Sequence, residues 1–260
     1  MNDRVLLTID DGVAEVRLNR ADKLNALDPA MFDALIEAID RLDGERAVRA
    51  VVLSGDGRGF CAGLDMASMA AAGDLGALAE QRHGIANRFQ QVAWGWHALP
   101  MPVIAALHGP VFGGGLQIAS GADVRIAAPD TRLSVMELKW GIVPDMAGFP
   151  LWRGLVRDDH LRECVYTARE FGAAEAQALG FVTRLADDQL VEARTLARAI
   201  ADRNPHAIRA AKRLAAVAAD ADPAAILAAE EAEQRALLGS ANQREAVAAN
   251  MARRTPVFED

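Results

Sequence analysis

Apolar residues occur at every second position near the start of the chain. One such run covers residues 5–9 and a second covers residues 13–18, with Asp10-Asp11-Gly12 between them. A period of two is typical of a strand with one buried face, and an Asp-Gly pair between two such runs is a strong hairpin signal. We therefore expect a β-hairpin at this end of the chain.

A helical period follows the hairpin. Asp28 precedes Pro29, the preferred order of an N-cap residue and a first helical residue, and apolar residues then recur three and four positions apart. This pattern predicts a helix over residues 28–43. Similar signals predict further helices over residues 76–98, 116–120, 157–167, 172–179, 187–203, 205–219 and 223–237.

Two continuous apolar runs, residues 50–54 and 103–107, have the length of strands. Consecutive apolar positions are typical of a strand that is covered on both faces, and a third such strand is expected at residues 124–127. Because strands, glycine-rich loops and helices recur in turn, we expect an α/β fold with crossover connections. Strand signals nearly vanish after about residue 148, so the C-terminal part is expected to be helical.

Composition narrows the class of protein. Apolar residues make up 52% of the 260 residues, a fraction that excludes disorder. The net charge of −8 argues against a general nucleic-acid binder, which needs a basic face. No apolar run approaches the roughly 20 residues of a membrane span, and the first residues do not resemble a signal peptide. We expect a cytoplasmic protein that binds neither nucleic acid nor membrane.

Cys61 and Cys164 are the two cysteines of the chain. Two cysteines make no disulfide framework, and no cluster of cysteine and histidine has the spacing of zinc ligands. We therefore expect a reducing compartment and no metal site. Because Cys61 lies in a glycine-rich loop, a nucleophilic thiol is an alternative, although no histidine and acid accompany it in an activating pattern.

Two glycine-rich loops each follow a predicted buried strand. They cover residues 57–65 and 108–117. Glycine permits positive φ and lets a ligand approach the backbone, and the second loop opens a helix whose first N–H groups suit a developing oxyanion. Neither loop fits a phosphate-binding P-loop or a dinucleotide fingerprint. Close packing of a helix on a strand would explain the same glycines, and their spacing leaves both interpretations open.

Glu137 and Asp145 are the candidate acid–base groups. Both have apolar neighbours, and Gly141 and Pro144 turn the chain between them. Two carboxylates held on one turn in an apolar setting have raised pKa values, which suits proton transfer. The alternative interpretation is a pair of solvated surface groups.

Several segments, taken together and in order, resemble the enoyl-CoA hydratase/isomerase (crotonase) family over nearly the whole chain. Each segment alone is a weak signal, whereas their order and separations are highly specific. The segments are Asn19-Arg20 with Lys23-Leu24-Asn25-Ala26-Leu27, Phe60-Cys61-Ala62-Gly63-Leu64-Asp65, His108-Gly109 with Gly113-Gly114-Gly115, Ala122-Asp123-Val124-Arg125-Ile126-Ala127, Thr167-Ala168-Arg169-Glu170-Phe171 with Leu179-Gly180-Phe181-Val182, and Arg254-Thr255-Pro256-Val257-Phe258.

The resemblance implies a core of ββα units wound into a superhelix over residues 1–195, and a helical region over residues 196–260 that is used in trimerisation. It also implies a homotrimer or homohexamer, an acyl-CoA thioester as substrate, and no cofactor beyond the CoA that the substrate carries. The backbone N–H groups of Ala62 and Gly114 would form an oxyanion hole. The implied substrate-binding positions are Ala62, Gly63, Leu64, Asp65, Gly114 and Gln117.

One position departs from the family's hydratases. The resemblance places two glutamates of those enzymes at positions 117 and 137, and this chain has Gln117 at the first. An amide cannot usefully accept a proton at neutral pH, although it can orient a water. Glu137 matches the single acid–base group of the family's isomerases. Asp145 matches a second carboxylate of dienoyl-CoA isomerases, which usually also have an aspartate at position 117.

Together with the resemblance, these residues predict an isomerase that moves double bonds of an unsaturated acyl-CoA through a thioester enolate, with Glu137 and Asp145 as its catalytic residues. A hydratase is the first alternative, in which Gln117 orients water and Glu137 alone transfers protons. A catalytically weak acyl-CoA-binding protein is the second.

Overall fold

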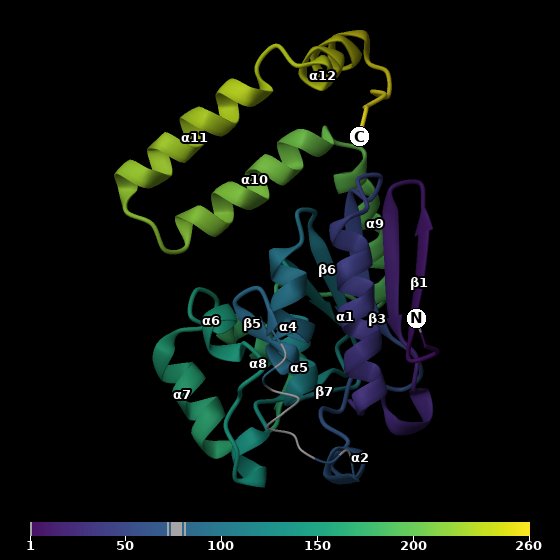
Figure 1. Cartoon of the computed structure of the whole chain (residues 1–260), viewed down its shortest axis with the longest axis vertical. Coiled ribbons are helices and arrows are strands. Elements are labelled where there is room, and N and C mark those ends of the chain that lie inside the picture. The colour runs from purple at the N-terminus through teal and green to yellow at the C-terminus, as the bar shows by residue number, and fades with distance from the viewer. Residues whose placement is uncertain (1, 72, 74–79, 81) are drawn as a thin grey trace.

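A six-stranded sheet runs through the middle of the molecule (Figure 1). The structure, a computed structural model, describes residues 2–71, 73, 80 and 82–260. The strands lie in the order β1-β2-β3-β6-β8-β11, and all neighbouring pairs are parallel except the antiparallel pair β1–β2. Their bounds are β1 Val5–Asp10, β2 Val13–Leu18, β3 Ala50–Gly55, β6 Val103–Leu107, β8 Val124–Ala127 and β11 Arg184–Leu185.

The predicted N-terminal hairpin is confirmed. Asp10 pairs with Val13, so Asp11 and Gly12 form a two-residue turn, in which φ is 44° and 78° respectively. Positive φ at both central residues is the requirement of the hairpin turn that matches the twist of the strands, and Asp-Gly satisfies it.

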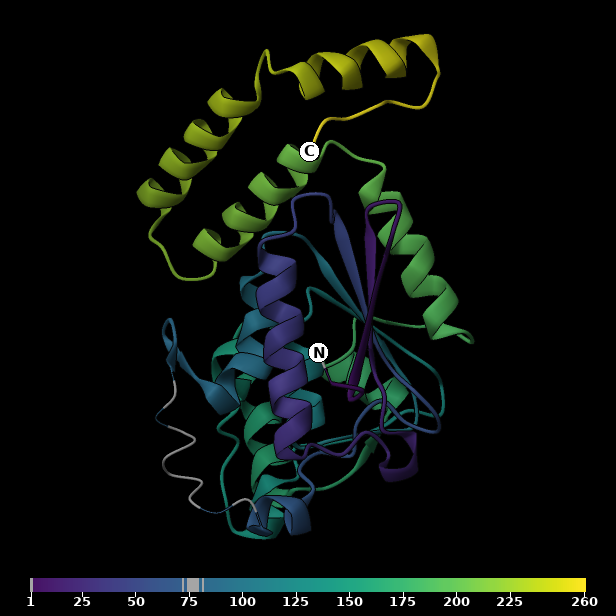
Figure 2. The same ribbon diagram turned by 45° about the vertical axis from the view of Figure 1, so that its right-hand side comes forward.

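Helices cover both faces of the sheet, as Figure 2 shows. On one face α1 (Pro29–Asp43) and α4 (Arg88–Ala98) pack against each other, and α9 (Gln189–Ala201) packs on the opposite face. The start of α1 is as predicted, because the Asp28 side chain accepts a hydrogen bond from the Met31 N–H at 2.8 Å. Strands β3 and β6 are buried at consecutive positions because both of their faces are covered.

A smaller sheet, in the order β10-β9-β7, carries the second glycine loop. Its parallel pair is β7 (Pro110–Phe112) with β9 (Arg132–Ser134), and β10 (Phe171–Gly172) joins β9 antiparallel. Two strands and a helix therefore recur along the chain, first as β6, β7 and α5 (Gly114–Ser120), then as β8, β9 and the 3₁₀ helix η2 (Glu137–Trp140). The helix of each repeat begins at a candidate site residue, Gly114 in the first and Glu137 in the second.

The helix predicted over residues 76–98 is shorter than expected. Helix α4 begins only at Arg88, and a hairpin of β4 (Arg82–His83) and β5 (Ala86–Asn87) precedes it. The reason is a capping box, in which Asn87 and Gln90 exchange side-chain to backbone hydrogen bonds and end the helix on that side. Residues 76–79 and 81 of the predicted helix lie outside the described residues.

Short helices connect the strands and surround the glycine loops. The helices predicted over residues 157–167 and 172–179 are confirmed as α7 and α8. Among the described residues, no helix is long and apolar enough to cross a membrane. The bounds of the short helices are η1 Ala21–Lys23, α2 Met66–Ala71, α6 Gly148–Trp152, α7 Asp158–Thr167 and α8 Ala173–Leu179.

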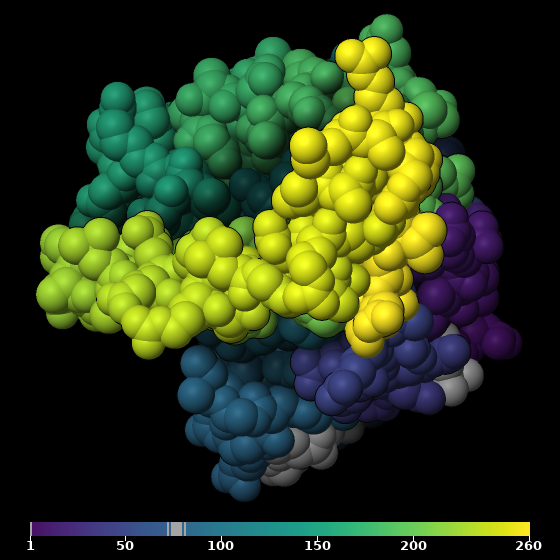
Figure 3. Space-filling model, turned by 90° about the horizontal axis from the view of Figure 1, so that it is seen from above, coloured from purple at the N-terminus to yellow at the C-terminus, as the bar shows by residue number. Residues whose placement is uncertain are grey.

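Three helices, which we call the C-terminal arm, lie at one end of the molecule (Figures 1 and 3). They are α10 (Pro205–Ala218), α11 (Pro223–Leu237) and α12 (Ala241–Ala252); the first two match predicted helices and α12 is additional. Helix α11 packs beside α10 and buries none of its own residues. The expected boundary at residue 195 falls inside α9, which packs on the sheet, so the arm begins only after Ala201.

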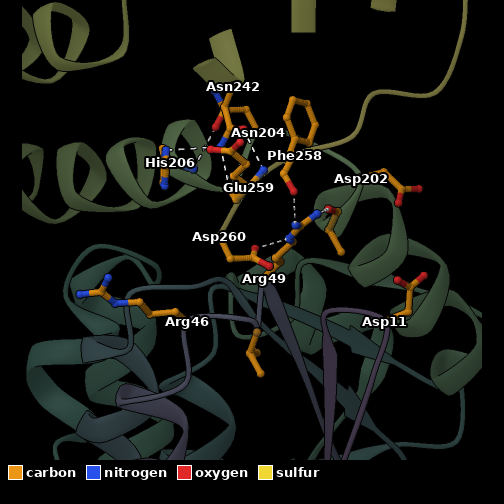
Figure 4. A network of polar contacts seen from close by, with 12 residues as sticks. Asp11, Arg46, Arg49, Asp202, Asn204, His206, Asn242, Phe258, Glu259 and Asp260 are labelled. Atoms are coloured by element: carbon orange, nitrogen blue, oxygen red, sulfur yellow. Dashed lines mark hydrogen bonds and ion pairs between the residues drawn. The ribbon is translucent and has the colours of Figure 1, made fainter. Parts of the chain in front are cut away.

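The end of the chain returns to the sheet and is held there by Arg49 (Figure 4). The Arg49 guanidinium donates to Asp260 Oδ1 at 2.7 Å and to the Phe258 carbonyl at 3.1 Å. Asn242 of α12 exchanges two hydrogen bonds with the backbone of Glu259, at 2.7 and 2.9 Å. The last residues therefore connect the arm to the start of β3.

Candidate active site

Backbone hydrogen bonds hold the first glycine loop, residues 57–65, on two sides. On one side the Cys61 N–H donates to the Pro110 carbonyl at 3.1 Å, and the Phe112 N–H donates to the Cys61 carbonyl at 3.0 Å. On the other side the Leu27 N–H donates to the Gly63 carbonyl at 2.8 Å, and the Asp65 N–H donates to the Leu27 carbonyl at 3.0 Å. The loop therefore lies between β7 and the segment that leads into α1.

One of the two expected oxyanion donors needs correction. The Ala62 N–H donates to the Leu24 carbonyl at 2.9 Å, so it is already engaged and cannot bind a ligand oxygen. The Leu64 N–H is different, because Leu27 pairs with the residues on either side of Leu64, which turns the Leu64 N–H away from Leu27. No acceptor for it occurs among the described residues. Leu64, rather than Ala62, is the available donor of this loop.

The second glycine loop brings Gly114 against the first loop. Gly113 has a φ of 51°, and its N–H donates to the Ser134 carbonyl at 2.9 Å. Helix α5 begins at Gly114, whose N–H has no acceptor within the described part of the chain. A Cβ atom added at Gly63 would lie 2.8 Å from the Phe112 carbonyl oxygen and 3.7 Å from the Gly114 nitrogen. The two loops are therefore in direct contact.

Leu64, Gly114 and Glu137 border one small cavity of about 90 Å³. The expected substrate positions Ala62, Gly63, Leu64 and Gly114 thus come together, whereas Asp65 and Gln117 do not line this cavity. The remaining lining is backbone and apolar side chains, contributed by Met66, Gly113, Met136, Trp140 and Ile142.

Glu137 is the first residue of η2 and is only 6% exposed. Its Oε1 accepts a hydrogen bond from Gln117 Nε2 at 2.6 Å, whereas its Oε2 is buried without a hydrogen-bond partner among the described residues. One carboxylate oxygen is therefore held by the protein and the other is free to take a proton. An unpartnered buried oxygen costs free energy, which makes it a candidate for a functional role.

Burial raises the pKa of the Glu137 carboxyl above its usual value, since desolvation disfavours the charged form. The pKa is lowered in part by the N–H groups of Glu137 and Met136 and by the amide of Gln117. The negative charge of Asp145 raises it further. The carboxylate is consequently a stronger base than an ordinary glutamate, as the apolar sequence context predicts.

Gln117 has a different place from the one expected. It is 1% exposed, and its Oε1 accepts hydrogen bonds from the Met146 N–H at 2.9 Å and the Gly148 N–H at 3.0 Å. With its Nε2 on Glu137, the amide bonds within the protein rather than facing the cavity. The expectation that Gln117 contacts substrate or orients a water is therefore corrected.

Asp145 lines a second, larger cavity of about 350 Å³. Asp145 is exposed to solvent, but part of its carboxyl group is buried, and this burial raises its pKa. The two carboxylates border different cavities but lie within electrostatic range, because the Asp145 charge raises the pKa of Glu137. The second cavity has mainly apolar walls, formed by Ile85, Ala86, Gln90, Trp94, Pro144, Ala147, Gly148, Phe149 and Pro150.

Two further candidates hold the loop rather than face a ligand. The Asp65 carboxylate pairs with Arg20 at 2.9 Å and accepts from the Ser68 N–H at 3.1 Å; these bonds, that of Ser68 above all, lower its pKa to about 2. The Cys61 thiol is buried and donates to the Asn25 carbonyl at 3.2 Å. Burial raises the pKa of Cys61 to about 12, which argues against the nucleophilic alternative.

Asn25 is a positioning residue whose role pattern analysis did not identify. It is fully buried, its Nδ2 donates to the carbonyls of Asp56 and Gly59, both at 2.9 Å, and its Oδ1 accepts from the Arg20 N–H at 2.8 Å. These bonds tie the first glycine loop to the segment before α1. The available signal was a single amide within the apolar run Leu24-Asn25-Ala26-Leu27, because such a side chain needs buried partners.

The chain is similar to several known proteins. The Thermus thermophilus protein assigned as an enoyl-CoA hydratase is 35% identical over 206 residues, which are 78% of this chain and 79% of that protein. The human mitochondrial delta(3,5)-delta(2,4)-dienoyl-CoA isomerase is 31% identical over 210 residues, which are 77% of this chain and 64% of that protein. The crystal structure of an enoyl-CoA hydratase from Bacillus anthracis matches with a TM-score of 0.88 at 27% identity and covers 98% of both chains.

The predicted fold class, a crotonase-like α/β core with a helical C-terminal region, is confirmed by these structural matches. The family model described as enoyl-CoA hydratase/isomerase matches residues 8–260, almost the whole chain. The chain therefore belongs to the enoyl-CoA hydratase/isomerase family.

Proposed function

We propose that this chain is an acyl-CoA double-bond isomerase that works through a thioester enolate. The observation that carries the proposal is the buried Glu137 carboxylate, of which Gln117 holds one oxygen. Within the described part of the chain its other oxygen has no hydrogen-bond partner, and the N–H groups of Leu64 and Gly114 beside the same cavity have no acceptor. A base beside such donors suits removal of a proton from the carbon next to a thioester carbonyl. CoA enters as part of the substrate, so the proposed reaction needs no separate cofactor.

The donors for the thioester oxygen are the N–H groups of Leu64 and Gly114. Loss of the α-proton places negative charge on that oxygen, and two preorganised donors stabilise the enolate more than the neutral thioester. One donor of this type typically contributes about 2.7–4 kcal/mol to lowering the barrier. Both are backbone groups on loops fixed by neighbouring strands, so little reorganisation accompanies the reaction.

Glu137 removes a proton from the α-carbon, and the electron pair moves into the conjugated system. For a diene, Asp145 in its protonated form supplies a proton at the far end, which forms the new C–H bond and shifts the double bonds. Asp145 then recovers a proton from solvent, to which it is exposed, and Glu137 releases the one it took. The raised pKa of Asp145 supports the protonated form that this step requires.

Hydration is the second candidate, and the names of several relatives favour it. Water addition needs a group that takes a proton from the attacking water and another that protonates the α-carbon. Glu137 is the carboxylate of the small cavity, and Gln117 cannot serve as the second proton carrier. We therefore expect hydration to be slow compared with isomerisation.

The decisive experiment follows the products of a substrate panel by NMR. We expect the purified protein to interconvert double-bond isomers of 3-enoyl- and 3,5-dienoyl-CoA thioesters and to form little 3-hydroxyacyl product from 2-enoyl-CoA. A 3-hydroxyacyl thioester as the main product would establish a hydratase instead. Tight binding in calorimetry without exchange of α-protons in deuterated water would establish a binding protein.

Variants assign the two carboxylates. Glu137→Gln is expected to lower the turnover of every substrate by about 10²–10⁴-fold, and Asp145→Asn to slow dienoyl substrates more than mono-unsaturated ones. Asp130→Asn, at an exposed aspartate outside both cavities, is the matched control and should leave both rates unchanged. Equal loss for both substrate classes in Asp145→Asn would remove Asp145 from the mechanism.

We also propose that the C-terminal arm mediates assembly into a homotrimer or homohexamer. Helix α11 buries none of its residues in the single chain, and Leu227 and Leu238 remain 64% and 61% exposed. Exposed apolar side chains of this size favour burial against another subunit. Light scattering during size-exclusion chromatography should give a mass of three or six chains, and a monomer would refute the proposal.

A further inference from the structure

We infer that Gln117 is a positioning residue that holds the Glu137 carboxylate and the turn after Asp145 in one arrangement, and that it disfavours water addition because its amide offers no free acceptor. This inference rests on the proposed function, since it assigns a role within the same site. It concerns which reaction the site performs, and it arises from the three hydrogen bonds of one buried side chain.

The orientation of the Gln117 amide is determined by its partners. Backbone N–H groups can only donate, so the two from Met146 and Gly148 require the amide oxygen to face them. The amide nitrogen must then face Glu137, and it lies 2.6 Å from Glu137 Oε1. A flipped amide would place donors against donors and an oxygen against a carboxylate. The arrangement therefore fixes Oε1 of Glu137 and leaves Oε2 as the proton acceptor.

The same side chain links the two proposed catalytic carboxylates. Its nitrogen holds Glu137, and its oxygen holds the backbone of Met146, the residue that follows Asp145. There is no spare room at the other end of this link, because a Cβ atom added at Gly148 would lie 2.8 Å from Gln117 Oε1. A change of the Gln117 side chain is therefore expected to disturb both carboxylates.

Water addition is disfavoured because the lone pairs of the Gln117 oxygen are used. An amide oxygen has two of them, and the N–H groups of Met146 and Gly148 occupy both. The amide nitrogen carries only hydrogens that it can donate, so it cannot take a proton from a water. Glu137 can thus take a proton from a substrate carbon, whereas Gln117 cannot act as a second base that takes a proton from an attacking water.

Helix α5 offers a matched structural control, Ser120, one turn beyond Gln117. Ser120 is also buried, and its hydroxyl accepts from Trp152 Nε1 at 2.7 Å, so it too ties α5 to the α6 region. It makes no contact with Glu137 in the hydrogen bonds of the described residues. Ser120→Ala therefore removes a buried polar bond of the same helix without touching the proposed catalytic groups.

The test compares Gln117→Met, Gln117→Glu and Ser120→Ala with the wild type over a range of pH. For Gln117→Met we expect kcat to fall roughly 10- to 100-fold, the scale of a misplaced catalytic group, with KM little changed because Gln117 does not line the cavity. In a plot of kcat against pH, the fall at low pH, which we call the acidic limb, reports protonation of Glu137. This limb should move to higher pH, because the ionised carboxylate loses a hydrogen bond and its pKa rises. Asp145 is the charged neighbour whose field acts on Glu137 within the described residues, and it is unchanged in all three variants.

Gln117→Glu keeps the length of the side chain and an acceptor for the two backbone N–H groups, so it remains informative if Gln117→Met does not fold. Two carboxyl groups at the 2.6 Å separation of the present pair must share a proton, so the acidic limb should again move to higher pH. A second proton carrier is now present, and 3-hydroxyacyl product should rise above the wild-type level. Ser120→Ala should lower the melting temperature and leave the limb in place.

A readout other than turnover separates this inference from the proposed function. The ¹³C carboxyl resonance of Glu137, assigned by its absence in Glu137→Gln, reports the titration of that group directly. A titration that moves in Gln117→Met but not in Ser120→Ala supports the positioning role, even if the wild type isomerises none of the panel. Unmoved titration and an unmoved limb in both Gln117 variants would overturn the role and leave the isomerase proposal standing.

Discussion

Replacement of Glu137 by glutamine should impair activity and stabilise the protein at the same time. The wild-type carboxylate is 6% exposed, and its Oε2 has no hydrogen-bond partner among the described residues. A buried group left unsatisfied costs about 1–3 kcal/mol. Glutamine has the same shape, and its N–H₂ would replace Oε2 as a buried group without a partner among the described residues. The gain therefore comes from removal of the buried charge, and we expect about 1 kcal/mol, the lower end of that range.

The stability gained in Glu137→Gln should increase with pH. Burial raises the pKa of Glu137 in the folded protein, so the folded state favours the protonated carboxyl. Wild-type stability from this group is then fully present below the unfolded pKa of about 4.3 and is lost as the pH rises through the folded pKa. The variant has no titrating group there. The difference in stability should therefore be small near pH 4 and grow towards pH 8.

Thermal unfolding at fixed protein concentration measures this difference. A gain of about 1 kcal/mol corresponds to a rise in Tm of about 2–4 °C for a domain of this size. The rate of double-bond isomerisation should fall by about 10²–10⁴-fold, the usual contribution of an acid–base group. A Tm difference that is constant from pH 4.5 to 8.5, or a wild type that is the more stable at pH 8, would refute the reasoning. Asp130→Asn serves as the control at each pH.

Three further predictions test other parts of the structure. Gly148→Ala should destabilise the fold by about 1–3 kcal/mol in denaturant titrations, because the new Cβ would lie 2.5 Å from the Trp152 ring. Cys61 should resist alkylation at pH 8 in the native protein and react after unfolding, because burial raises its pKa to about 12. Arg49→Ala should free the end of the chain, seen as faster trimming by carboxypeptidase, since Arg49 holds it by the bonds of Figure 4.

Elements specified by local pattern were predictable from the sequence. The Asp-Gly turn of the first hairpin, the Asp28 cap of α1 and the buried runs of β3 and β6 each follow from a few neighbouring residues. Strands of two or three residues, such as β10 and β11, are too short to show a period, and they form only because a partner strand is present. The predicted start of α4 was wrong for a related reason. The capping box of Asn87 and Gln90 begins the helix at Arg88, although the helical pattern extends before it.

The sequence identified the two loops and the glutamate that border the small cavity, but not which of their atoms are available there. A resemblance can identify a loop, yet it cannot say which N–H of that loop is free. The Ala62 N–H is bonded to Leu24, whereas pairing with Leu27 leaves the Leu64 N–H without an acceptor among the described residues. Both contacts join segments more than thirty residues apart in the chain. The role of Gln117 likewise depends on partners at Met146 and Gly148, which no local pattern contains.

Close packing and oxyanion binding, the two interpretations of the glycine loops, depend on each other in this fold. A Cβ atom at Gly115 would lie 2.4 Å from the Cys61 carbonyl oxygen, and one at Gly63 would lie 2.8 Å from that of Phe112, so neither position has room for a side chain. Any other residue there would push the loops apart and separate the Leu64 and Gly114 N–H groups. Because an oxyanion accepts hydrogen bonds well only at about 2.7–3.1 Å, such a separation would weaken the proposed stabilisation. The glycines are therefore needed for packing, and through packing for the chemistry.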